Sequence, residues 1–196
     1  MITDIYYVIP EIFLSLSLMF LLILGVFNKK GSIIVYNLSL LILIITIPLI
    51  LNVPSDGEIL IFNESYKVDY LSNFIKILIV ISTLFVLLTS SQYLKSIKIF
   101  NIEYPILILS SILGMMVMVS SNDLIVFYIG LELQSLALYV LASFNRDNIL
   151  SSESGLKYFV LSALSSGLLL YGCSLVYGFS SSTNFLQISF NYDQSS

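Results

Sequence analysis

Apolar segments about 20 residues long recur along almost the whole chain. A helix needs roughly 20 apolar residues to cross the hydrocarbon core of a bilayer, so each segment predicts a membrane-spanning helix. We count six, separated by short polar connectors: residues 5–27, 32–51, 70–94, 104–121, 124–144 and 154–177. The sequence therefore predicts an all-α, polytopic membrane protein that forms one membrane domain over residues 1–196.

The scarcity of charged residues supports this class. Only 10% of the residues are charged and 58% are hydrophobic, whereas a soluble domain carries about 25% charged residues. The chain has no histidine and a single cysteine, Cys173. This composition excludes a haem, zinc or iron–sulfur site built on His or Cys clusters of this chain, and no basic patch indicates binding to nucleic acid.

The charges of the connectors predict the orientation of the helices. Basic residues follow the first, third and fifth segments: Lys29, Lys30, Lys95, Lys98 and Arg146. The connector of residues 52–69 carries Asp56 and other acids, and residues 58–66 alternate loosely enough for a short hairpin. Basic loops remain on the cytoplasmic or matrix side. We therefore expect the N-terminus, this connector and the polar tail of residues 180–196 on the opposite side.

Glu132 lies about nine residues into the fifth segment, close to the bilayer midplane at 1.5 Å per residue. A charge at this depth costs about 2.5–3.5 kcal/mol. Tyr128, Ser135 and Tyr139 share its helical face, so this stripe is expected to face protein or trapped water. Two interpretations stay open: a carboxylate that relays protons, or a protonated carboxyl that only bonds a neighbouring helix.

Lys157 lies near the start of the sixth segment, roughly 5 Å inside it. An ammonium near a carboxylate favours its charged form, so Lys157 is a candidate member of a proton relay. It can equally extend to the interface, and Glu153 is placed to pair with it across one helical turn. Hydroxyl residues of the same segment, including Ser162 and Ser166, favour close helix packing, with support of a water chain as the lesser alternative.

The remaining unusual residues have simpler interpretations. Glu11 and Lys76 lie near the side of the acidic connector, and we expect both side chains to extend to the interface. Cys173 is expected to be a small buried apolar residue.

Four short motifs carry a resemblance to a known family. They are PEIFL at residues 10–14, SSNDL at 120–124, GLELQSL at 130–136, and GLKYF at 155–159 followed by Leu161–Ala163. They resemble NADH dehydrogenase subunit 2, the antiporter-like membrane subunit of respiratory complex I, closely over residues 104–178 and loosely elsewhere. The resemblance implies the N-terminal part of an antiporter-like fold, in a proton-translocating NADH:ubiquinone oxidoreductase. It also implies that Glu132 is one half of a Glu–Lys pair and that Lys157 lies near the proton path.

The same resemblance implies parts that this chain does not contain. The family's lysine partner for Glu132 belongs to helices beyond the sixth, so we expect a second chain that carries the C-terminal part of a split subunit. A truncated or reduced subunit is the alternative. Other membrane-arm subunits and lipids are the further expected partners. NADH, FMN, iron–sulfur clusters and ubiquinone are expected on other subunits.

The location and role leave alternatives open. The lack of a basic leader fits a bacterial and an organelle-encoded product equally well. The abundance of residues typical of AT-rich genomes favours the mitochondrial inner membrane, with the N-terminus and the polar tail on the intermembrane-space side; a bacterial plasma membrane is the alternative. The alternative roles are a structural scaffold subunit without proton transfer and a component of a cation/proton antiporter.

Overall fold

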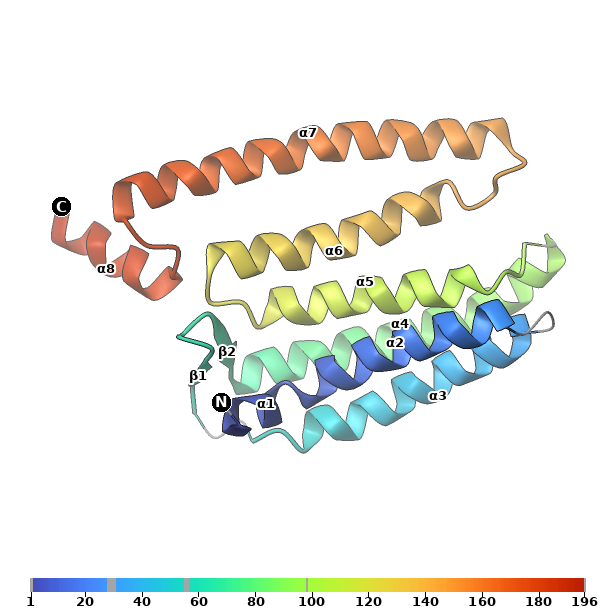
Figure 1. Ribbon diagram of the computed structural model, residues 1–196, viewed down its shortest axis with the longest axis horizontal. Coiled ribbons are helices and arrows are strands. Elements are labelled where there is room, and N and C mark those ends of the chain that lie inside the picture. The colour runs from blue at the N-terminus through green and yellow to red at the C-terminus, as the bar shows by residue number, and fades with distance from the viewer. Residues whose placement is uncertain (1, 28–30, 55–56, 98, 196) are drawn as a thin grey trace.

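The computed structural model describes residues 2–27, 31–54, 57–97 and 99–195. The predictions that used Lys29, Lys30, Asp56 and Lys98 lie outside these described residues. In chain order the described elements are α1 (Ile2–Tyr7), α2 (Ile9–Phe27), α3 (Gly31–Leu51), β1 (Ile59–Ile61), β2 (Tyr66–Val68), α4 (Tyr70–Ser96), α5 (Glu103–Val119), α6 (Leu124–Ala142), α7 (Ile149–Ser180) and α8 (Phe185–Ser195) (Figure 1).

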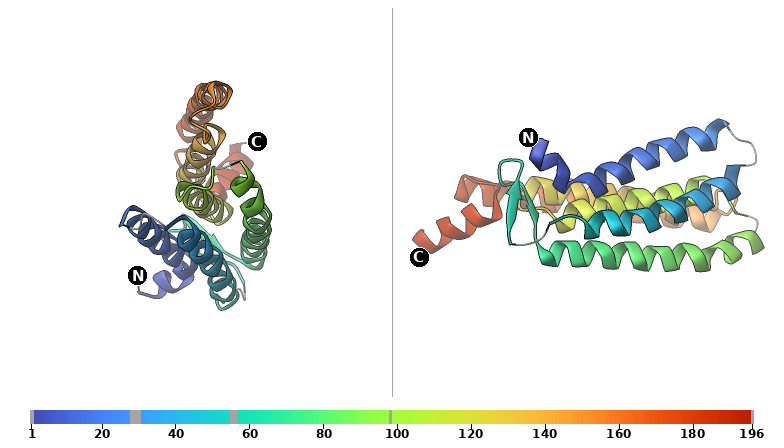
Figure 2. Two further views of the ribbon diagram at one scale, coloured as in Figure 1. Left: turned by 90° about the vertical axis from the view of Figure 1, so that its right-hand side faces the viewer. Right: turned by 90° about the horizontal axis from the view of Figure 1, so that it is seen from below.

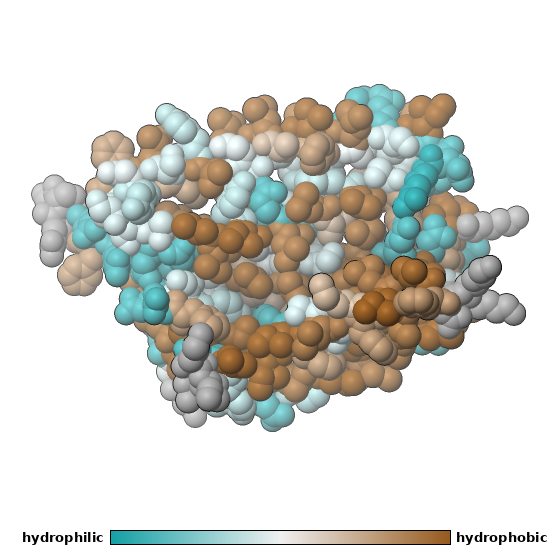
Figure 3. All heavy atoms as spheres, in the orientation of Figure 1, coloured by the Kyte–Doolittle hydropathy of each residue, from teal (hydrophilic) through white to brown (hydrophobic). Residues whose placement is uncertain are grey.

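The long helices confirm the prediction of an all-α, multi-pass membrane protein. Within the described residues, α2, α3, α4, α6 and α7 are long and apolar enough to cross a membrane. Helix α5 is also apolar, and its 17 residues extend about 26 Å at 1.5 Å per residue, close to the thickness of the hydrocarbon core. Hydrophobic side chains cover most of the middle of the bundle in Figure 3.

Local chemistry explains where the helix ends differ from the sequence prediction. The first segment is divided at Val8, and Pro10 lies in the first turn of α2, where a missing N–H is tolerated. Helix α7 begins before the predicted residue 154, because the side chain of Asn148 caps it by accepting from the Leu150 N–H at 3.0 Å. It ends at Ser180, and the next residue, Ser181, is a left-handed C-cap with a φ of 54°. The predicted polar tail contains α8.

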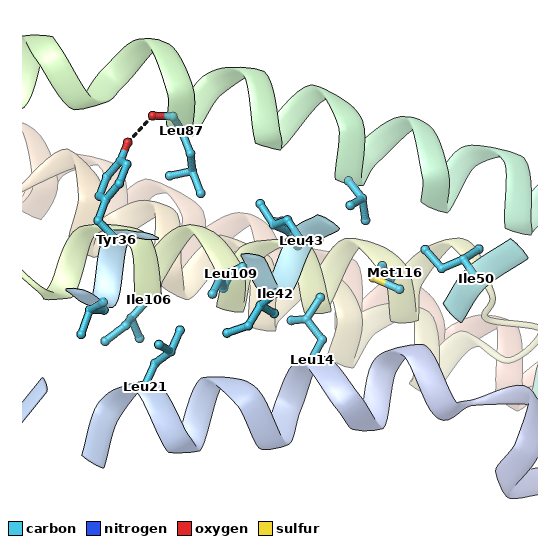
Figure 4. Close-up of a cluster of buried hydrophobic side chains, with 13 residues drawn as sticks. Leu14, Leu21, Tyr36, Ile42, Leu43, Ile50, Leu87, Ile106, Leu109 and Met116 are labelled. Carbon is cyan, nitrogen blue, oxygen red and sulfur yellow. Dashed lines mark hydrogen bonds between the residues drawn. The ribbon is translucent and has the colours of Figure 1, made fainter. Parts of the chain in front are cut away.

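The helices form a four-helix group to which α6 and α7 are added in a row. Helices α2 to α5 enclose a core of buried apolar residues (Figure 4), with Leu14, Leu43, Leu87 and Leu109 contributed by the four helices in turn. Seen along the helices, α5, α6 and α7 lie one above the other (Figure 2). Helix α7 therefore packs mainly on α6 and α8, and most of its surface is left uncovered by the described residues.

Three connectors at one end of the bundle are joined by hydrogen bonds into what we call the cap: residues 59–68, 120–124 and 181–185. The predicted hairpin is confirmed by the antiparallel pair β1–β2. The N–H of Lys67 donates to the carbonyl of Ser120 at 2.8 Å. The side-chain amides of Asn122 and Asn184 donate to the carbonyl of Glu64 at 2.8 and 3.0 Å. The cap thus fixes the turn that precedes α6.

Candidate functional site

The polar stripe of α6 faces α7. The opposite face of α6 lies against α5, because a Cβ on Gly130 would approach the Gly114 carbonyl oxygen of α5 to 3.0 Å. Glu132 follows Gly130 by two residues, which is about 200° around the helix axis. Its face therefore points away from α5, towards the helix on the other side of the row, α7 (Figure 1). The lipid-exposed side of α6 consists of apolar residues such as Ile129 and Leu136.

Glu132 is the ninth residue of the 19-residue helix α6 and is half-buried. Its Oε1 atom is buried and has no hydrogen-bond partner among the described residues. Ser135 does not bond this carboxyl, because its hydroxyl donates to the Glu132 backbone carbonyl at 3.0 Å. A carboxyl oxygen that is buried without a partner in hydrocarbon is costly, so this atom needs a proton, a water molecule or a partner from another helix.

Tyr139 and Ser162 connect α6 to α7 through a hydrogen bond between their hydroxyl groups. The Tyr139 ring is buried and makes edge contacts with Tyr158 and Phe159, with ring centroids 5.0 and 5.7 Å away. One turn further, Gly155 lies against Ser143 so closely that a Cβ on the glycine would be 2.4 Å from the serine Cβ. The two helices are thus closed at this end.

Lys157 lies away from Glu132. The Tyr139–Ser162 bond sets the antiparallel register of α6 and α7. Glu132 lies seven residues from this bond in one direction and Lys157 five residues in the other, which places them roughly 18 Å apart along the axis. The Lys157 side chain is 73% exposed and pairs with Glu153 at 2.5 Å. The predicted Glu153 pair is therefore confirmed, whereas contact between Lys157 and Glu132 is not formed.

Ser166 is a predicted site residue of α7 that lies closer to Glu132 than Lys157 does. In this register, Ser166 and Glu132 are within one helical turn of each other along the helix axes. The Ser166 side chain is half-buried and its hydroxyl donates to the carbonyl of Ala163 at 3.2 Å. It retains lone pairs that can accept a hydrogen bond.

A groove of about 470 Å³ separates α6 and α7 at the end near the cap. It is lined by Leu124, Ile125, Tyr128, Leu170, Cys173, Ser174, Tyr177 and Thr183. Cys173 is half-buried on this groove, so the expectation that it is buried within the protein is wrong. Tyr128 lies one helical turn from Glu132, so the groove extends from the cap towards the carboxyl group.

A buried charge cluster was missed by the sequence interpretation. Glu11 of α2 and Lys76 of α4 form an ion pair with 2.7 Å between Oε1 and Nζ, and only 5% and 2% of these side chains are exposed. The Tyr66 hydroxyl of β2 donates to the same Oε1 atom at 2.8 Å. The expectation that both charged side chains extend to the interface is therefore wrong. Opposite charges at equal depth in two helices were the available signal.

This fold defines a polytopic, all-α membrane protein with a half-buried carboxylate on the α6–α7 face. A family model described as "NADH:quinone oxidoreductase/Mrp antiporter, TM" matches residues 121–195. NADH-quinone oxidoreductase subunit N of Pelagibacter ubique is 71% identical over 179 residues, 91% of this chain and 38% of that protein. The same subunit of Bartonella bacilliformis is 48% identical over 93% of this chain and 37% of that protein.

Solved structures agree with these sequence relatives. A chain of respiratory complex I from Thermus thermophilus superposes with a TM-score of 0.74 at 26% identity, covering 89% of this chain and 38% of that chain. A chain of an archaeal membrane-bound sulfane sulfur reductase gives a TM-score of 0.78 at 16% identity, covering 94% of this chain and 39% of that chain, which shows a shared fold. The chain is therefore similar to the antiporter-like membrane subunits of complex I, and it spans about 38% of the length of the curated relatives that it matches.

Proposed function

We propose that this chain is part of a proton-translocating membrane-arm subunit of NADH:quinone oxidoreductase, and that Glu132 binds and releases the translocated proton. The observation that carries the proposal is the Oε1 atom of Glu132, which is buried in the middle of α6 and has no hydrogen-bond partner in the part of the chain that the structure describes. Burial disfavours the charged form of a carboxyl and a nearby cation favours it, so a cation that approaches and withdraws would load and release a proton.

We propose that the cation comes from helices outside this chain. Lys157 is exposed and roughly 18 Å from Glu132 along the axis. At an effective dielectric constant of about 20, two unit charges at that distance interact by only about 0.9 kcal/mol. Lys157 therefore acts through its field or through a partner chain, whereas Glu132 takes the proton.

The surface of α7 supports a partner chain. Apolar residues on opposite faces of α7 are exposed, for example Leu161 and, nine residues later, Leu170, and the curated relatives are longer than this chain. We propose that helices corresponding to the remaining length of the relatives pack on α6 and α7, either in a second chain of a split subunit or in a longer form of this one. We propose that NADH, FMN, the iron–sulfur clusters and ubiquinone bind to other subunits.

The relatives also change the proposed location. The sequence alone favoured a mitochondrial inner membrane, but the most similar curated relatives reported above are bacterial. We therefore propose a bacterial plasma membrane, with the cap on the side opposite the cytoplasm, as the basic connector residues Lys95 and Arg146 at the other end suggest.

Replacement of Glu132 in the assembled complex tests the function. We expect Glu132→Gln to leave assembly intact and to lower proton pumping and coupled NADH oxidation at least tenfold. Glu103→Gln is the matched control, since this carboxylate is exposed and pairs with Arg146 at 2.7 Å. If Glu132→Gln assembles and pumps normally, the chain has the alternative role of a structural scaffold.

A further inference from the structure

In the buried cluster of Glu11, Lys76 and Tyr66, only one of the two carboxylate oxygens of Glu11 accepts hydrogen bonds from the described residues. Oε1 of Glu11 accepts from both Lys76 and Tyr66, whereas Oε2 is buried and has no hydrogen-bond partner among the described residues. Buried polar atoms are nearly always bonded, so an exception calls for a physical explanation. A proton on Oε2 can be accommodated without displacing either donor from Oε1.

Tyr66 keeps its proton and remains a hydrogen-bond donor to Glu11. Burial of the phenol and the neighbouring Glu11 carboxylate raise the pKa of Tyr66 well above its usual range. The hydroxyl group therefore remains a donor at physiological pH. Among the described residues, the titratable groups in contact with the Glu11 carboxylate are Lys76 from α4 and Tyr66 from β2. The Lys76 Nζ atom also lies 3.2 Å from the Tyr66 phenol oxygen.

A cleft of about 220 Å³ lies beside the cluster, at the end of the bundle that carries the cap. Its lining includes Asn73, which lies one turn before Lys76 on the same face of α4. Water that enters this cleft is about one helical turn from Lys76, the partner of Glu11.

The hairpin connects the cluster to the helix that carries Glu132. Beside Tyr66, the Lys67 N–H bonds the Ser120 carbonyl at 2.8 Å, and the Asn122 N–H bonds the Ser65 carbonyl at 2.9 Å. Ser120 and Asn122 belong to the α5–α6 turn, which immediately precedes α6. The hydrogen bond from the Tyr66 hydroxyl group to Glu11 thus holds the hairpin, and with it this turn, against α2.

We propose that Glu11, Lys76 and Tyr66 form a second proton-binding site, which takes its proton from water at the cap and whose charge state sets how firmly the hairpin is held. With Glu11 charged, the carboxylate binds Lys76 and Tyr66 by charge-assisted hydrogen bonds, which are about twice as strong as neutral ones. With Glu11 protonated, both bonds weaken and the hairpin opens more often. The site requires no proton transfer at Glu132.

Infrared difference spectra of the full chain in lipid nanodiscs, recorded as the pH is lowered, test proton binding. We expect a C=O band of a buried protonated carboxyl that is lost in Glu11→Gln and kept in Glu132→Gln. Glu58→Gln is the matched control, because this carboxylate is 66% exposed on the same hairpin and its removal must leave the band in place. If no band depends on Glu11 while the chain stays folded, the cluster has only a structural role, binds no proton, and the proposal is wrong.

Glu11→Gln leaves the ammonium group of Lys76 buried without its ion-pair partner. Combining Glu11→Gln with Lys76→Gln gives a variant without an unpaired buried charge. This double variant must also lack the band. It keeps the experiment decisive if Glu11→Gln alone does not fold, since removal of one partner of a buried pair is strongly destabilising.

Hydrogen exchange of the amides that join the hairpin to the α5–α6 turn tests whether the charge of Glu11 controls how firmly the hairpin is held. After correction for the intrinsic pH dependence of exchange, we expect the amides of Lys67 and Asn122 to exchange faster in wild type as the pH falls. Tyr66→Phe keeps the ring but removes the donor, and should raise their exchange about tenfold at neutral pH. In the double variant the pH dependence should vanish. Exchange rates that do not respond to Tyr66→Phe, or an unchanged pH dependence in the double variant, would overturn the link between charge and hairpin.

Discussion

Gly114 of α5 and Gly130 of α6 face each other where neither helix has room for a methyl group. A Cβ on Gly114 would lie 2.8 Å from the Gly130 carbonyl oxygen, and a Cβ on Gly130 would lie 2.8 Å from the Met118 backbone nitrogen. Small residues permit such close approach of membrane helices. This contact orients α6 so that Glu132 points away from α5.

Gly130→Ala should therefore destabilise the protein by about 1–3 kcal/mol, the usual cost of overpacking a close contact. Thermal unfolding in detergent measures this loss. Gly167→Ala on α7 is the matched control, since a Cβ there meets no atom within 4 Å; it should be neutral or slightly stabilising, because alanine is the better helix former. Equal effects of the two substitutions would contradict the close packing of α5 and α6.

The hydrogen bond between Tyr139 and Ser162 should be measurable as a coupling energy. Tyr139→Phe and Ser162→Ala each remove one hydroxyl group of the pair. In a double-mutant cycle of unfolding in detergent we expect a coupling of about 0.6 kcal/mol, the average for hydrogen bonds between membrane helices. Ser166→Ala paired with Tyr139→Phe is the control and should show no coupling. Absence of coupling in the first pair would mean that the two hydroxyl groups are not bonded in the membrane.

Lys157→Gln should lower proton pumping by the assembled complex at most several-fold. Its interaction with Glu132 across roughly 18 Å is below about 1 kcal/mol at an effective dielectric constant of about 20. Glu153→Gln removes the exposed partner of the same pair and serves as the control for the loss of a surface ion pair. A loss with Lys157→Gln as large as that with Glu132→Gln would show that Lys157 is a direct proton carrier, completed by a partner chain.

Asp69 at the start of α4 should make stability depend on pH. Although partial burial raises the pKa of Asp69, hydrogen bonds from the Ser72 backbone and hydroxyl group and from Lys67 outweigh it and lower that pKa. A depressed carboxyl pKa stabilises the folded state above the unfolded pKa of about 3.9, and this contribution is lost as pH falls through the lower folded value. Unfolding in detergent over a pH series would show it as a decline below about pH 4.

Two substitutions separate the charge of Asp69 from its capping role. Asp69 accepts from the Ser72 N–H at 2.7 Å, so Asp69→Ala should lose about 1 kcal/mol through the lost N-cap. Asp69→Asn keeps a capping side chain and should retain most of that stability but lose the pH dependence. A decline of equal size in Asp69→Asn would assign the pH effect to another carboxyl.

Residue patterns within short segments predicted one face of α6 and the hairpin. The helical spacing predicted that one face of α6 carries Tyr128, Glu132, Ser135 and Tyr139. In the structure that face is turned towards α7, and an apolar face of α6 is exposed. The alternation around residues 58–66 predicted the hairpin that β1 and β2 form. Both predictions depend on periodicity within a short segment, which the sequence contains directly.

The sequence by itself determined the membrane class, the approximate positions of the long apolar helices, the hairpin and the place of Glu132 near the middle of its helix, because hydrophobic length and helical period are properties of neighbouring residues. Only the tertiary structure decided which charges meet. It buried Glu11 with Lys76 at 2.7 Å and left Lys157 exposed beside Glu153. The reason is that such pairing depends on which helices pack together and in what register, and residues 65 positions apart carry no local pattern that records it.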